Sequence, residues 1–193
     1  MINDAILPTG TQYEISHGPW QAIVTEQGAT LRSLHYEGTD VIKSFDADQS
    51  PTSSQGQQLL PWPNRIRDGH YTFDGMEQQL AVSEVDRHNA IHGLVAWSRW
   101  SLVEHTDTSV TQTIRIMARP GWPGTISVRL THRLSDAGLA VEVTARNVGT
   151  TAVPFGYAAH PYLCLGGTID DWTVDAPFTC LLYTSDAADD LLC

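Results

Sequence analysis

Mostly apolar and mostly polar positions alternate over two consecutive stretches of the chain, residues 126–134 and 139–145. A period of two places the apolar side chains on one face of an extended strand and the polar ones on the other. Between the stretches lies Ser135-Asp136-Ala137-Gly138, whose Asp and Gly supply the turn chemistry of a hairpin. The pattern therefore predicts an antiparallel hairpin with one face on a core.

Shorter apolar segments elsewhere predict further strands, many of them separated by turns that contain Gly or Pro. These segments are residues 13–16, 22–26, 31–36, 71–73, 100–105 and 113–117. The polar residues 46–58 are expected to form a mobile loop, and no stretch of convincing length has the period of a helix. Many short strands with frequent turns are typical of an all-β antiparallel sandwich or barrel, here in a single domain.

Composition narrows the classes of function. The 193 residues carry a formal net charge of −11, which argues against nucleic acid or an anionic membrane as a partner. No apolar run approaches the roughly 20 residues that span a bilayer, and the first residues do not have the pattern of a secretory signal. The three cysteines form neither an even set nor a CxxC pair, so we expect a reducing compartment and a cytoplasmic protein.

Two segments offer a proton donor and a cation. His160 precedes Pro161, which imposes an extended backbone on it, and an imidazole suits proton transfer near neutral pH. Asn64-Arg65 follows a stiff proline-rich segment, so the guanidinium can present a fixed fork of donors to sugar oxygens. The alternative for Arg65 is a surface ion pair with a carboxylate such as Asp68.

A third segment, residues 89–93, contributes His92, which on a loop can form a hydrogen bond with a ligand oxygen. His88 and His92 have the i, i+4 spacing of a helical metal pair, but Asn89 and Gly93 are poor helix formers. We therefore expect no metal there. His88 and His132 are expected to be interior histidines whose ring nitrogens have hydrogen-bond partners.

Gly28-Ala29-Thr30-Leu31, Asn64-Arg65-Ile66, His92-Gly93 and His160-Pro161-Tyr162 together resemble, in order and spacing, the motifs of the aldose 1-epimerase (galactose mutarotase) family. The resemblance covers most of residues 1–179. It implies a large antiparallel β-sandwich of the galactose mutarotase type. It also implies a free sugar as the small-molecule partner, with no metal, nucleotide or other cofactor.

The resemblance further implies interconversion of the α and β anomers of a free aldohexose of the glucose or galactose type. His160 would be the acid that donates to the ring oxygen, while His92, Arg65 and Asn64 hold the sugar. The family's base is a late glutamate, expected beyond the region present here. The glutamates of this chain, Glu84 among them, lie in the wrong part of the sequence to replace it, so we expect this chain to be inactive.

The end of the chain has a different character. From Cys180 the residues resemble the translation of a sequencing adapter, so we expect residues 180–193 to be a non-native tail. Residues 1–179 are then the N-terminal part of one domain, incomplete at the C-terminus. Missing strands would leave unpaired edges and exposed apolar faces, and hence a tendency to aggregate.

Two other functions fit the same motifs. One is a hexose-6-phosphate 1-epimerase, which needs further cations, and Arg67, Arg87 or Arg99 could supply them. The other is a non-catalytic sugar-binding module, which would keep its sugar affinity when His160 is removed.

Overall fold

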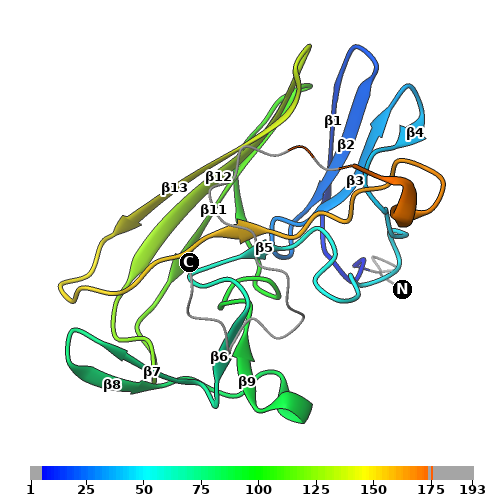
Figure 1. Ribbon diagram of the computed structural model, residues 1–193. Coiled ribbons are helices and arrows are strands. Elements are labelled where there is room, and N and C mark those ends of the chain that lie inside the picture. The colour runs from blue at the N-terminus through cyan, green and yellow to red at the C-terminus, as the bar shows by residue number, and fades with distance from the viewer. Residues whose placement is uncertain (1–5, 174, 176–193) are drawn as a thin grey trace, which may run out of the picture.

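Two four-stranded antiparallel sheets dominate the computed structural model, which describes residues 6–173 and 175 (Figure 1). The first sheet contains, in spatial order, β1 (Gln12–His17), β2 (Trp20–Thr25), β3 (Leu31–Tyr36) and β4 (Thr39–Asp40). The second contains β10 (Ser101–His105), β11 (Ser109–Ile116), β12 (Ile126–Ser135) and β13 (Gly138–Asn147). Each strand pairs with its neighbour in sequence. The all-β antiparallel sandwich predicted from the sequence is thus confirmed.

Three short pairs and two 3-10 turns complete the described fold. The pairs are β5 (Gln58–Leu59) with β14 (Ala158–Ala159), β6 (Arg65–Arg67) with β9 (Asn89–Ile91), and β7 (His70–Phe73) with β8 (Met76–Gln79). The 3-10 turns are η1 (Val85–Arg87) and η2 (Ile169–Asp171). In this part of the chain there is no helix with the length and apolar character needed to cross a membrane. The expected non-native tail lies outside the described residues.

The core consists of two clusters along the sandwich, and their burial is the main force that holds the sheets together. One joins the inner face of β1, β2 and β3 to β11 and β12. Its buried members are Tyr13, Ile15, Ala22, Val24, Leu31, Leu34, Ile42, Val110 and Leu134. The other cluster packs the segments around β5, β6 and β9 against β11 and β12, with Trp100 and Trp122 at its centre. This second cluster supports the loops that carry the predicted site residues.

The predicted hairpin is confirmed as β12 and β13. Ser135 pairs with Gly138, which leaves Asp136 and Ala137 as the turn. The alternate apolar positions of β12 are all buried, whereas Val141 on β13 is 39% exposed. Within the described residues β13 is the edge of its sheet, and part of its apolar face is uncovered.

Two larger differences from the sequence prediction have the same cause, the burial of polar residues. β11 begins at Ser109 instead of residue 113, because Thr111 forms a hydrogen bond of 2.9 Å with Thr131 and Gln112 donates to the carbonyl of Thr25. The polar segment 46–58, predicted as a mobile loop, contains turns and ends in a buried run over residues 55–58. There Gln57 donates to the carbonyl of Ala96 at 3.2 Å. Polar residues with internal partners can occupy a core, and an alternation pattern does not show those partners.

Candidate active site

The β6–β9 pair brings two of the predicted site segments together, in the lower part of Figure 1. Arg65 pairs with Ile91, so that Asn64 and His92 lie side by side at one end of the pair. The N–H of His92 donates to the carbonyl of Asn64 at 2.9 Å, and the N–H of Asn64 donates to the ring Nδ1 of His92 at 3.1 Å. Both residues have positive φ, +56° and +60°, which turns the chain sharply at this point.

The hydrogen bond from Asn64 decides which nitrogen of His92 carries the proton. A ring nitrogen that accepts an N–H is unprotonated, so the neutral ring has its hydrogen on Nε2. Burial and then the charges of His160 and Arg65 lower the pKa of His92 to about 4. At neutral pH, His92 is therefore an uncharged imidazole with a donor at Nε2.

His160 reaches the same place from the β5–β14 pair. Its N–H donates to the carbonyl of Gln57 at 3.1 Å, and its carbonyl accepts from Gly56 at 2.9 Å. The rings of His160 and His92 meet edge to face, with centroids 5.6 Å apart and planes at 84°. On its other side, His160 stacks on Tyr162, with centroids 5.2 Å apart. The predicted acid is thus held between two rings, next to the donor of His92.

Arg65 completes the cluster and is also ion-paired. Its Nε and Nη2 donate to the two carboxylate oxygens of Glu84 at 2.8 and 2.9 Å, and its Nη1 donates to Oδ1 of Asn64 at 3.1 Å. Hydrogen bonds from Arg65 and Asn89, with the charges of Arg65 and Arg87, lower the pKa of Glu84 to about 2. The ion pair predicted as the alternative for Arg65 is present, with Glu84 and not Asp68 as the partner.

The structure brings together all four predicted site residues, Asn64, Arg65, His92 and His160. Sequence reasoning missed Glu84, which lies only five residues before Asn89 and contacts it. His88 was predicted to be interior and is exposed instead, because it ends η1 with a left-handed φ of +55°.

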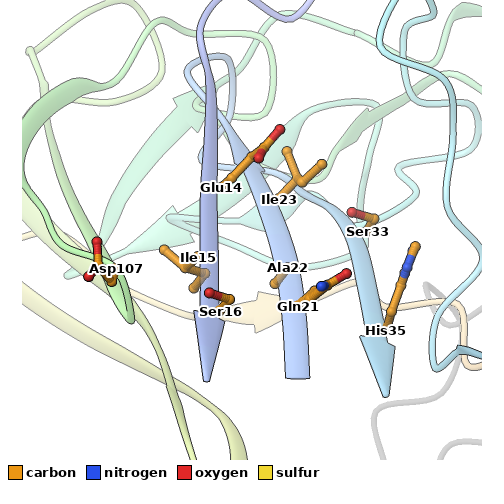
Figure 2. Close-up of a pocket in the computed structure, with 9 residues that line it drawn as sticks. All are labelled: Glu14, Ile15, Ser16, Gln21, Ala22, Ile23, Ser33, His35 and Asp107. Carbon is orange, nitrogen blue, oxygen red and sulfur yellow. The ribbon is translucent and has the colours of Figure 1, made fainter. Parts of the chain in front are cut away.

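Two hollows lie away from this cluster, on the outer face of β1, β2 and β3. One has a volume of about 520 Å³ and is lined by residues that include Glu14, Ser16, Gln21 and His35 (Figure 2). These side chains alternate along the strands with the core residues, and so face away from the core. None of the predicted site residues lines this hollow. We base the functional assignment on the cluster because its groups converge with defined hydrogen bonds.

The structure thus joins two histidines, an arginine and an asparagine at one place in an antiparallel β-sandwich. The family model for aldose 1-epimerase matches residues 11–184. The chain belongs to the aldose 1-epimerase family. The matched range ends within residues 180–193, so the boundary after residue 179 stays a prediction.

Individual relatives agree with this assignment. The chain is 34% identical over 171 residues to the uncharacterized protein YihR of Escherichia coli K12, covering 88% of the chain and 56% of the relative. It is 25% identical over 189 residues to the aldose 1-epimerase of the same organism, covering 89% and 54%. A crystal structure of a putative aldose 1-epimerase from E. coli K12 superposes with a TM-score of 0.69 at 26% identity, covering 81% and 53%. The chain spans about half the length of the curated relatives it matches.

Proposed function

We propose that the whole protein interconverts the α and β anomers of a free aldohexose at this cluster. The observation that carries the proposal is the edge-to-face contact between the rings of His92 and His160. Arg65 is linked to His92 through Asn64, which accepts a hydrogen bond from Arg65 and donates one to His92. This geometry supports the proposal because two imidazoles and a guanidinium lie close enough together for one small ligand to contact them. A sugar hemiacetal needs such a set, because its ring oxygen, anomeric hydroxyl and neighbouring hydroxyls lie close together.

The reaction requires two proton transfers. A base removes the proton of the anomeric hydroxyl while His160 donates one to the ring oxygen, so that the bond between C1 and the ring oxygen breaks and an aldehyde forms. Rotation about the C1–C2 bond and reversal of both transfers give the other anomer and restore both groups. His92 Nε2 and Arg65 hold the oxygens during these steps.

The base needs a separate source. Glu84 is the carboxylate that contacts the cluster within the described residues, but both of its oxygens accept hydrogen bonds from Arg65. Its pKa of about 2 also makes it a poor proton acceptor. We propose that another carboxylate of the whole protein is the base, and that the 193-residue chain alone does not catalyse the reaction.

Polarimetry of freshly dissolved α-D-galactose tests both the activity proposed for the whole protein and the inactivity proposed for the 193-residue chain. The longer gene product, translated from the source gene as it continues after the codon for Thr179, should accelerate mutarotation. In that longer product, His160→Ala should reduce the rate by about 10²–10⁴-fold. The 193-residue chain should give the rate of buffer, with E. coli aldose 1-epimerase as the positive control. If the 193-residue chain accelerates mutarotation, the proposal that it is inactive is wrong. If the longer gene product has no activity, the epimerase proposal is wrong.

One observation favours the phosphorylated-sugar alternative. Arg67 lies on the same side of β6 as Arg65, and Arg87 is close enough for its charge to lower the pKa of Glu84. Arg99 is ion-paired with Glu26 on another part of the surface. Inhibition of the longer product by glucose 6-phosphate at concentrations well below those of glucose would favour this substrate class over free sugars.

A further inference from the structure

Glu84 is held in place from two directions. Its Oε2 accepts hydrogen bonds from Arg65 Nε at 2.8 Å and from the side-chain amide of Asn89 at 2.9 Å. Its backbone also pairs with Asn89, whose N–H donates to the Glu84 carbonyl at 3.1 Å and whose carbonyl accepts from Glu84 at 2.9 Å. Asn89 is buried and belongs to β9. The carboxylate is therefore fixed to the same strand that leads into His92.

The carboxylate in turn fixes the guanidinium. The Arg65 and Glu84 side chains are only 15% and 21% exposed, and their two parallel hydrogen bonds define the plane of the guanidinium. That orientation directs Nη1 to the Asn64 side chain, at 3.1 Å. The backbone N–H of Asn64 then holds Nδ1 of His92. A continuous set of hydrogen bonds thus runs from Asn89 through Glu84, Arg65 and Asn64 to the His92 ring.

We propose that Glu84 is a positioning residue for the sugar site, which orients Arg65 and, through Asn64, keeps His92 with its hydrogen on Nε2. The inference rests on the proposed function, because it assigns Glu84 a role in holding the sugar. Glu84 does not itself exchange protons with the substrate. It acts by fixing two groups that contact the sugar.

The variant Glu84→Gln tests the role in the 193-residue chain, since it keeps the size of the side chain but removes its charge. A glutamine can accept only one of the two Arg65 hydrogen bonds, and its own NH₂ would face a donor. Glu104→Gln, at an exposed glutamate on β10, is the matched control. Glu84→Asp keeps the negative charge on a shorter side chain, so it should hold Arg65 and His92 in place better than Glu84→Gln does. Unchanged amide NMR signals of β12 and β13 verify that each variant is folded.

Two ¹⁵N NMR signatures report the positioning without any ligand. We expect the Arg65 Nε–H signal to be sharp and slow to exchange in the parent chain and in Glu104→Gln, and to exchange with solvent in Glu84→Gln. The His92 ring nitrogens should change from the single Nε2–H form to a mixture of tautomers. The pKa of His92 should also fall below about 4, because the Glu84 charge raises it. Parent-like signatures in Glu84→Gln would overturn the proposal.

Titration with D-galactose separates a positioning role from a merely structural one. Affinity should fall about tenfold or more in Glu84→Gln, the loss expected when a hydrogen bond to a charged group is weakened, and not in Glu104→Gln. Equal galactose affinity in the parent chain, Glu84→Gln and Glu104→Gln would overturn the positioning role. If the parent chain does not bind galactose while the Arg65 and His92 signatures change as expected, the orienting role of Glu84 is supported. The proposed function is then decided separately, by the mutarotation rate of the longer gene product.

Discussion

Replacement of Gly93 by alanine should destabilise the chain by about 2–5 kcal/mol, as left-handed backbone strain and overpacking add. Gly93 has a φ of +77°, and a Cβ there would overlap the carbonyl oxygen of Leu60. That carbonyl cannot move easily, because it also accepts the N–H of Leu94 at 2.8 Å. Urea unfolding followed by tryptophan fluorescence measures the free-energy change.

Gly75 provides the matched control for this substitution. Its φ of +72° is nearly the same, but a Cβ there would meet nothing within 4 Å. Gly75→Ala should therefore lower the free energy of unfolding only by the cost of the left-handed backbone, about 1–2 kcal/mol. The excess loss in Gly93→Ala measures how tightly the segment before Asn64 packs against the loop of His92. Equal losses for the two variants would mean that this close approach is absent.

Acid should destabilise the folded chain through His132, at the centre of β12. The side chain is fully buried, both of its ring nitrogens lack a hydrogen-bond partner, and burial lowers its pKa to about 4. The predicted interior position of His132 is confirmed, whereas the hydrogen-bond partners predicted for its ring nitrogens are absent within the described residues. Its pKa in the unfolded chain is about 6.5, so between about pH 6.5 and pH 4 the unfolded chain binds a proton that the folded chain does not.

Stability is therefore lost as the pH falls through this window, by up to about 1.4 kcal/mol per pH unit and about 3 kcal/mol in all. His132→Leu should remove this contribution and raise the free energy of unfolding at pH 7, because two buried polar atoms without partners disappear. His92 contributes in the same direction, more weakly because its ring is half-buried. His70→Gln, at an exposed histidine, is the control. An unchanged pH slope in His132→Leu would contradict the assignment.

The long strands could be predicted because each has enough residues to show its period. β12 and β13 run for ten residues each, and their turn residues fixed the register. The pairs β5–β14 and β6–β9 could not be found this way, because two or three residues have no visible period. These strands form through contacts between segments far apart in the sequence, such as Gln58 with Ala159.

The site was predicted from motif order, and the structure adds what the motifs do not contain. That Asn64, Arg65, His92 and His160 meet follows from the resemblance. The tautomer of His92 depends on one backbone N–H, and the orientation of Arg65 depends on Glu84. The sequence alone does not show that the Asn64 N–H contacts His92 or that Glu84 contacts Arg65. Glu84 follows Arg65 by nineteen residues, and the two come together only because β6 pairs with β9.

The most direct test of the central claim is a titration of the longer gene product with D-galactose, followed by the NMR signals of its histidine side chains. The account predicts saturable shifts of the His92 and His160 ring signals. The exposed His70 on β7 and His35 in the outer hollow should stay unchanged (Figure 2). Saturable shifts at His35 with none at His92 and His160, or no saturable shift at any histidine, would contradict the claim that this cluster holds the sugar.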